Sequence, residues 1–516
     1  MSNGVGGSPE RVKREDVVAI AQAVGLATVA VIPAFLIGAL AVSLRAELGF
    51  GPSGLGLVIA WFFVVSSACS TMLGQVVERV GVGPSLAIGA ATSGTALFGV
   101  AFAPSYLWLL VAMTLGGASN AITQPAVNAS LSRRIAAGRL GLAFGIKQSA
   151  IPAATLLGGL AVPTLGVLLG WRGTFMVVGV CAFIGAAVGF RSGQKAVPSG
   201  GRKRRNVRDL PDLRSLVILS CAGLLGAASS TSLGSFFVDA GVEAGLAESA
   251  AGLLFALASA LGLSMRIFLG WVADLRPYRS RFSAIATLLF VGVPGYLLLA
   301  TGVPAWYVIG GVFAYAAGWS WPGLYHYTIV SQNPTMPAAA TGVIQTGMSF
   351  GGGLGPLLVG FVAERTSYNI AWLVAASLAC GSATLFLVGR AHLHRARRTA
   401  AAAYLDEVSD LRFDDERFDT VAHGVESQRR ITDHLSVTLY RAAPGVTYEV
   451  PPAARTGVVL VLGEGAVRLR VATIDSVAVA GEHLPVPANR SWSLSNGGRS
   501  PLLLAQVEYH GLSVPS

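Results

Sequence analysis

The run Gly200-Gly201-Arg202-Lys203-Arg204-Arg205 stands near the middle of this 516-residue chain, inside a basic stretch from Arg191 to Arg214. Six hydrophobic segments precede the stretch and six follow it, between Val17 and Gly389. Each segment is long enough to cross the ~30 Å hydrocarbon core of a bilayer. The pattern predicts an all-α polytopic membrane protein with twelve transmembrane helices in two pseudo-symmetric six-helix halves.

Composition favours the same interpretation, because 53% of the residues are hydrophobic and only 12% are charged, whereas roughly a quarter are charged in typical soluble proteins. The net charge of +11 comes from basic residues between the hydrophobic segments. We therefore expect a lipid bilayer as partner and no nucleic acid. Most of these basic loops fall on one side, which the positive-inside rule makes cytoplasmic. This predicts a multi-pass protein of the cell (plasma) membrane with both termini in the cytoplasm.

Beyond about Thr399 the hydrophobic segments give way to short alternating runs such as Val437-Thr438-Leu439-Tyr440. Alternation of this kind predicts β-strands joined by turns. The expected organisation is a cytoplasmic N-terminus (1–16), an N-terminal six-helix half (17–190), a cytoplasmic basic linker (191–214), a C-terminal six-helix half (215–389), a charged linker (390–430) and a small all-β domain (431–516).

The two halves repeat each other at two places. After the second segment the chain reads Gly74-Gln-Val-Val-Glu78-Arg79-Val-Gly81, and after the eighth it reads Gly270-Trp-Val-Ala-Asp274-Leu-Arg276. An acid follows the glycine by four residues in both. The fifth and eleventh segments also correspond, since Gln148 and Gln345 each stand three residues after a glycine. Such duplication is common among transporters and places the substrate between the copies.

These residues resemble the major facilitator superfamily, whose members carry Gly-x-x-x-Asp-Arg-x-Gly between helices 2 and 3 and a weaker copy between helices 8 and 9. The resemblance covers about residues 15 to 390, although Glu78 replaces the aspartate and no basic residue directly follows Gly81. Arg266 is loosely similar to the helix 8 arginine of the monocarboxylate-carrier branch. The resemblance implies a cytoplasmic latch that favours one conformational state, formed by Gly74, Glu78, Arg79, Gly81, Gly270, Asp274 and Arg276. Anchoring at the membrane surface is the simpler alternative for the arginines.

The last segment resembles a cupin barrel in two places, the Gly463-Glu464-Gly465 turn and the stretch from Val486 to Asn496. In metal-binding cupins these motifs supply histidines and a glutamate. Here the histidines of the segment stand elsewhere, at His423, His434, His483 and His510. The resemblance implies a metal-free cupin-like domain, which either stabilises the protein or holds a small ligand.

Polar residues inside hydrophobic segments are costly in hydrocarbon unless they face protein or a water-filled cavity, so they mark candidate substrate contacts. Lys147 and Arg266 are the embedded charges and are candidate anchors for an anion, with snorkelling toward the headgroups as the alternative. Paired amides from the two halves can bind a carboxylate, or can simply join helices. His326 could couple protons, or could be an interfacial residue. The candidate substrate-binding residues are Lys147, Arg266, Gln148, Gln345, Asn120, Gln124, Trp321 and Tyr325.

The sequence therefore predicts a secondary active transporter of a small organic solute, most simply an organic anion such as a carboxylate, that works by alternating access. No acid lies well within a hydrophobic segment, which disfavours export of cationic drugs. No nucleotide-binding loop occurs, so we expect no cofactor, no enzymatic activity and energy from a gradient. Two alternatives stay open: a multidrug or metabolite exporter of the same superfamily, and a membrane sensor whose cupin-like domain binds a ligand.

Overall fold

The computed structural model describes residues 14–132, 140–191, 213–275, 281–333, 336–409, 419–431, 435–451, 457–461, 466–471, 474–479, 483–486, 491–497 and 501–509. Residues 192–212 of the basic linker, Arg276, His434, His510 and the Gly463–Gly465 turn, all singled out from the sequence, lie outside these residues.

The helices fall into two groups. The first consists of α1 (Arg14–Ala39), α2 (Ala41–Leu48), α3 (Pro52–Val80), α4 (Val82–Ala101), α5 (Tyr106–Ser132), α6 (Leu140–Gln148), α7 (Ala150–Ala161), the π-helix η2 (Val162–Gly166) and α8 (Val167–Arg191). The second consists of α9 (Leu213–Glu243), α10 (Glu248–Leu275), α11 (Phe282–Leu299), α12 (Pro304–Phe313), the π-helix η4 (Ala314–Gly318), α13 (Pro322–Gln332), α14 (Pro337–Arg365) and α15 (Tyr368–Ser409).

Within the described residues, ten helical stretches are long and apolar enough to cross a membrane. One of them, Gly141–Phe190, has 50 residues. It bends at Gly170, whose φ of 66° lies in the left-handed region that favours glycine. In the second group α12, η4 and α13 have 10, 5 and 11 residues, so this apolar stretch is divided into short pieces. The fold is a mostly helical, multi-pass membrane protein, and the number of twelve helices stays a prediction.

The two groups of helices meet along two seams. At one seam α3 packs against α14, and at the other α10 packs against α6 and α7. Glycines allow the close approach that helix packing in a membrane favours. A Cβ added to Gly159 of α7 would lie only 2.6 Å from the backbone nitrogen of Ala256 in α10. Backbone therefore lies against backbone where the halves touch.

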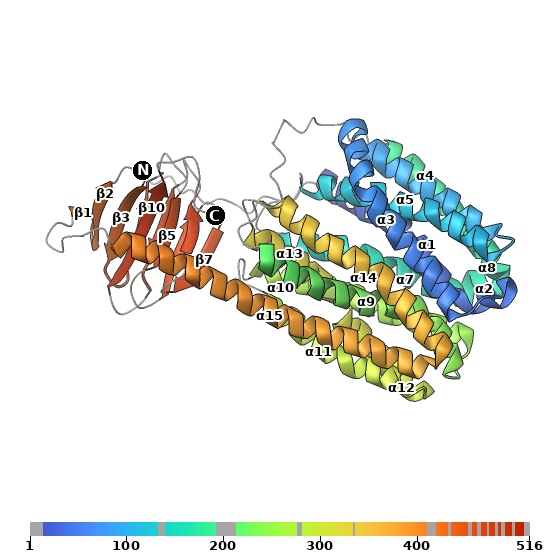
Figure 1. The fold of residues 1–516 in the computed structure, drawn as a ribbon. Helices are drawn as coiled ribbons and strands as arrows, with labels where there is room; N and C mark the ends of the chain where they lie inside the picture. Colours follow the sequence, from blue (N-terminus) through green and yellow to red (C-terminus); the bar gives the residue numbers. More distant parts are fainter. Residues whose placement is uncertain are drawn as a thin grey trace.

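The strands lie at one end of the bundle, and α15 runs from the bundle out to them (Figure 1). We call this end of the bundle the strand-domain side, and the opposite end, where α2 lies, the far side (Figure 1). Because successive helices alternate in direction, the end of α3, the start of α6 and the start of α14 lie toward the strand-domain side. The end of α14 and the start of α3 lie toward the far side.

In the described part of the C-terminal region, ten strands form two sheets in which every pair is antiparallel. One sheet has the order β1-β2-β3-β10-β5-β8 and the other the order β4-β9-β6-β7. Trp492 and Leu494 belong to a core that these strands enclose by themselves. The strands are β1 (Asp419–Ala422), β2 (Val425–Ile431), β3 (Leu435–Ala442), β4 (Thr447–Val450), β5 (Gly457–Val461), β6 (Ala466–Val471), β7 (Ile474–Val479), β8 (His483–Val486), β9 (Trp492–Ser495) and β10 (Leu502–Tyr509).

The segment 390–430, expected as a charged linker, contains regular structure. Helix α15 continues to Ser409, through the run Ala400–Ala403, since alanine has the highest helix propensity. Strands β1 and β2 follow, and β2 pairs with β3 over its whole length. The sequence of β2, Val-Glu-Ser-Gln-Arg-Arg-Ile, has apolar residues only at its ends. The hydrophobic pattern of β2 does not indicate a strand. Its strand conformation comes from its pairing with β3.

Candidate functional site

A break between α6 and α7 brings polar atoms into the middle of the bundle. The carbonyl oxygen of Gln148 would accept a hydrogen bond from the N–H group of residue 152 in a continuous helix, but Pro152 has no N–H group. A second break, between η4 and α13, lies in the other half at Trp319, Ser320 and Trp321. Helix ends leave carbonyl groups that need other donors.

Arg266 of α10 provides those donors at both breaks. Its Nη1 donates to the Gln148 carbonyl oxygen, and its Nε and Nη2 donate to the Trp319 carbonyl oxygen at 3.0 and 2.6 Å. The side chain is only 1% exposed. Its guanidinium also lies over the Trp319 ring, 5.3 Å from the centroid. The arginine thus ties a broken helix of the first half to one of the second.

Asp274 of α10 binds the other end of α6. Its Oδ1 accepts a hydrogen bond from the Gly141 N–H group and its Oδ2 from the Leu142 N–H group, each at 2.7 Å. A carboxylate is favoured at a helix N-terminus, where unpaired N–H groups and the helix dipole attract it. Gly270 makes this approach possible, because a Cβ there would lie 2.5 Å from the Gly141 carbonyl oxygen. Helix α10 of one half therefore holds both ends of α6 of the other.

The repeated segment in the first half has different surroundings. Glu78 and Arg79, at the end of α3, are exposed. Gly81 ends α3 with a φ of 97°, and its N–H group donates to the Val77 carbonyl oxygen at 2.9 Å. A Cβ at Gly74 would meet nothing within 4 Å. The two acids of the repeat are thus unequal in this structure: Asp274 contacts the opposite half, and Glu78 faces outward.

The packing of α3 against α14 also differs along their length. Toward the far side the two helices touch, since a Cβ at Gly360 would lie 2.5 Å from the Pro52 carbonyl oxygen. Contact continues to Gly352, where an added Cβ would lie 3.3 Å from the Phe63 ring. Toward the strand-domain side an added Cβ at Gly74 or Gly342 meets nothing within 4 Å. The close contact found toward the far side is therefore absent at these two glycines.

The far side is closed by polar contacts between the halves. Arg45 of α2 pairs with Asp239 of α9, which also accepts a hydrogen bond from the Tyr368 hydroxyl. The Ser53 N–H group at the start of α3 donates to Glu364 at the end of α14 at 2.7 Å. Each of the two acids has a partner in the opposite half, so these contacts depend on how the two halves dock.

Four polar side chains form a chain of hydrogen bonds that runs from α6 through α13 to α14. Gln148 Nε2 lies 2.8 Å from His326 Nδ1, and His326 Nε2 lies 3.2 Å from Gln345 Oε1. Gln345 Nε2 donates in turn to the Ser349 hydroxyl at 3.2 Å. Phe144 stacks on the His326 ring, with centroids 6.0 Å apart. The chain joins α6 to α13 and α14 and ends at Ser349, and its third member, Gln345, is exposed.

Lys147 lies beside this chain in the last turn of α6. Its side chain is 7% exposed, and it directly precedes Gln148 in the sequence. Among the residues that the structure describes, Lys147 has no hydrogen-bond or ion-pair partner. The site thus combines a buried cation with two amides and an imidazole, which together can bind a carboxylate.

The remaining candidates from the sequence lie elsewhere. Asn120 donates to the Ser66 hydroxyl at 2.8 Å, and Gln124 donates to Asn120 at 3.2 Å, so this pair joins α5 to α3 within the first half. Trp321 and Tyr325 are fully buried and pack against Phe386 of α15. The structure therefore joins Gln148, His326 and Gln345 by hydrogen bonds. Lys147 precedes Gln148 in α6, and Arg266 donates to the Gln148 carbonyl oxygen. Sequence reasoning missed Ser349, which follows Gln345 by one helical turn.

The strand domain holds a polar cluster of its own. The Tyr440 hydroxyl and the Trp492 indole nitrogen both lie 3.3 Å from Gln506 Oε1, and Gln506 Nε2 donates to Glu508. In the described part of the chain, no group of three or more His, Cys, Asp or Glu residues is arranged to hold a metal ion.

Comparisons with known proteins concern the fold. The family described as the Major Facilitator Superfamily matches residues 22–346 and 219–430. A bacterial homologue of the human lysosomal transporter Spinster, solved in an inward-facing and occupied conformation, has a TM-score of 0.57 at 17% identity, over 75% of this chain and 98% of that chain. A point mutant of the nucleoside transporter NupG has a TM-score of 0.59 at 14% identity, over 72% of this chain and 99% of that one. No curated protein matches the sequence.

Proposed function

This chain belongs to the Major Facilitator Superfamily of secondary transporters, and we propose that it moves a small organic anion, most simply a carboxylate, by alternating access. The observation that carries the proposal is Lys147, a buried cation with no partner among the described residues. A charge in a region of low dielectric is costly unless an opposite charge is near. A bound carboxylate would supply that charge at the seam between the halves.

The neighbouring side chains suit the same ligand. Gln148 and Gln345 come from opposite halves and offer amide N–H donors beside the lysine. Arg266, expected from the sequence as a second anchor, already directs its guanidinium to two backbone carbonyl groups. We assign it a positioning role, because it fixes the end of α6 on which Lys147 and Gln148 stand.

His326 is placed to couple a proton to the substrate. Its Nδ1 lies 2.8 Å from Gln148 Nε2 and 2.9 Å from the Pro322 carbonyl oxygen. A neutral ring that is unprotonated at Nδ1 accepts from the Gln148 amide, whereas a protonated ring donates to the carbonyl group. In this proposal, binding a proton moves the ring from one partner to the other and releases Gln148 for the substrate.

The finer predictions about topology belong to the same proposal. We place the strand-domain side in the cytoplasm of a cell with a plasma-membrane location, on the basis of the basic loops, and retain twelve helices and the loose similarity to monocarboxylate carriers. Gly74, Glu78, Arg79, Gly81, Gly270, Asp274 and Arg276 form the latch, of which Asp274 carries the contact between the halves in this state. The strand domain is proposed as a metal-free cupin-like module.

Thermal stabilisation by ligands tests the proposal. The full-length chain, Lys147→Ala and a form ending at Ser409, which keeps α15 whole, are heated with carboxylates, neutral sugars and cationic drugs. The proposal expects a carboxylate to raise the melting temperature of the full-length and shortened forms but not of Lys147→Ala. Stabilisation by cationic drugs that is equal in the full-length chain and in Lys147→Ala would favour an exporter instead. Stabilisation that the shortened form loses would favour a sensor.

A further inference from the structure

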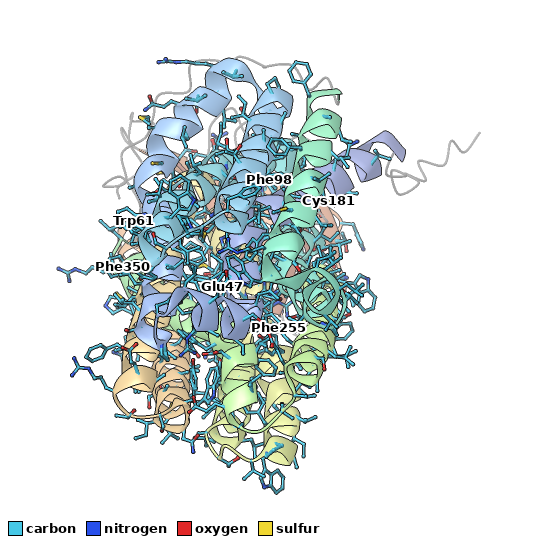
Figure 2. All side chains as sticks on the ribbon, turned by 90° about the vertical axis from the view of Figure 1, so that its right-hand side faces the viewer. Glu47, Trp61, Phe98, Cys181, Phe255 and Phe350 are labelled. Carbon is cyan, nitrogen blue, oxygen red and sulfur yellow. The ribbon has the colours of Figure 1, made fainter. Side chains whose placement is uncertain are left out.

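An apolar groove of about 350 Å³ lies between α3 and α14, within the range of small-molecule sites. Its walls include Ala60, Val64, Ser67, Ala68, Ser349 and Phe350. Val64 is 52% and Phe350 63% exposed. Figure 2 shows Phe350 and Trp61, which is also exposed, on the same flank of the bundle. The groove therefore lies on the outer surface, which faces hydrocarbon in a membrane-spanning bundle.

The groove lies next to a tight contact between α3 and α14. Beside it the helices still touch, at Phe63 and Gly352, and beyond it an added Cβ at Gly74 or Gly342 meets nothing within 4 Å. Ala68 stands about halfway along α3, which runs from Pro52 to Val80. The groove thus opens toward the bilayer at mid-depth, and Gln345 stands on its strand-domain side, one turn before Ser349 in α14.

The groove and the polar chain share a residue. Ser349 lines the groove, and its hydroxyl accepts a hydrogen bond from Gln345 at 3.2 Å. Gln345 in turn contacts His326, whose other ring nitrogen lies 2.8 Å from Gln148. The groove is therefore linked, through Ser349 and one turn of α14, to the polar chain that includes Gln148, the neighbour of the buried cation Lys147. The combination matches a molecule with an anionic head and an apolar tail.

We propose that the substrate is an amphipathic monocarboxylate whose acyl chain occupies this groove and which enters sideways from the leaflet on the strand-domain side. The inference rests on the function proposed above and names its substrate class. The carboxylate reaches Lys147 and the two amides, while the chain stays against Val64, Ala68 and Phe350. A substrate without an acyl chain would make no contact in the groove, which lipid would then occupy, so the groove would not contribute to its binding free energy.

Chain length and groove filling test this inference. Acetate, butyrate and octanoate are titrated into protein in nanodiscs of neutral phosphatidylcholine, below the aggregation limit of each acid. Burial of each methylene favours binding by about fourfold, so octanoate should bind at least tenfold more tightly than butyrate. Ala68→Phe fills the groove and should reduce octanoate affinity to that of butyrate. Ala187→Phe, at an exposed position of α8, is the matched control and should change neither affinity.

Leu354→Ser keeps the inference testable if Ala68→Phe does not fold, because Leu354 also lines the groove and is 40% exposed. This variant should weaken octanoate several-fold and leave butyrate unchanged. Equal affinities for butyrate and octanoate, both dependent on Lys147, would contradict the assignment of the groove as the acyl-chain site. They would leave the proposed carboxylate transport unaffected. Carboxylate binding that Lys147→Ala does not weaken, or no binding of any carboxylate, would contradict both the groove assignment and the proposed function.

Discussion

Asp274 and Arg266 stand two helical turns apart on α10 and hold opposite ends of α6, a helix of the other half. Asp274 accepts two N–H groups at the start of α6, and Arg266 donates to the carbonyl group at its end. Both contacts satisfy backbone groups that a helix end leaves unpaired. Lys147 therefore stands on a nine-residue helix, and the position of this helix depends on α10.

Replacement of Arg266 by methionine should destabilise the protein, because the Gln148 and Trp319 carbonyl groups lose buried donors, each worth about 1–3 kcal/mol. Arg266→Lys keeps a cation and should lose less. The melting temperature of each variant in detergent is the measurement. Unchanged stability together with a large loss of carboxylate affinity would instead make Arg266 a direct anion anchor.

The two acids of the repeat should respond differently to replacement. Asp274→Ala removes the N-terminal cap of α6 and should cost about 0.5–2 kcal/mol. Glu78→Ala, at an exposed position of the same repeat, is the matched control and should stay within about 0.5 kcal/mol. Thermal unfolding of the two variants side by side checks this. Equal losses would show that both acids are engaged in the prevailing state.

Stability at low pH should depend on Glu47 of α2. Hydrogen bonds from the Trp171 indole, at 2.6 Å, and from Arg172 lower the pKa of the Glu47 carboxyl below its ordinary value of 4.5. A lowered folded-state pKa stabilises the protein above the unfolded pKa, and this stability is lost as the pH falls through the folded value.

Glu47→Gln isolates that effect from other carboxylates. The melting temperature of the wild type should exceed that of the variant by a constant amount above about pH 5. The difference should shrink as the pH falls below about 4.5. Melting curves between about pH 7 and pH 3 measure it. A difference that does not change with pH would mean that the charge of Glu47 contributes nothing.

Gln506 should matter to the strand domain and not to the bundle, because the strands enclose their own core. Gln506→Leu leaves the Tyr440 hydroxyl and the Trp492 indole without their acceptor, at about 1–3 kcal/mol each. The control is Thr447→Ala, at an exposed position of β4. Limited proteolysis should cleave the strand domain of Gln506→Leu sooner while the bundle keeps its melting temperature. A lower melting temperature of the bundle together with faster cleavage of the strand domain would show that the two parts unfold as one unit.

The helical fold was predictable because hydrophobic segments of membrane length are a strong signal, and the family match confirms it. Lys147 was conspicuous for the same reason, as a charge in an apolar run. The partners of Arg266 were harder to foresee, since backbone carbonyl groups leave no side-chain pattern. The position of Pro152 is the one signal in the sequence. It stands four residues after Gln148 and lacks the N–H group that would bond to the Gln148 carbonyl oxygen in a continuous helix.

Other features depend on tertiary structure alone. The repeat predicts that Glu78 and Asp274 are counterparts, but one sequence must serve every conformation, so it does not indicate which acid is engaged in this one. The pairing of Arg45 with Asp239 joins residues 194 positions apart, beyond the reach of local pattern. Likewise, the mostly polar sequence of β2 becomes a strand only through its register with β3.

The most direct test of the central claim is solute counterflow in proteoliposomes. Vesicles loaded with unlabelled octanoate or butyrate are diluted into the labelled acid, with wild type, Lys147→Gln and the charge-conserving Lys147→Arg compared at equal reconstitution. The account predicts saturable uptake of a labelled carboxylate by the wild type, most of it kept by Lys147→Arg and lost by Lys147→Gln. Counterflow of a neutral or cationic solute that Lys147→Gln leaves intact, with none for any carboxylate, would contradict it.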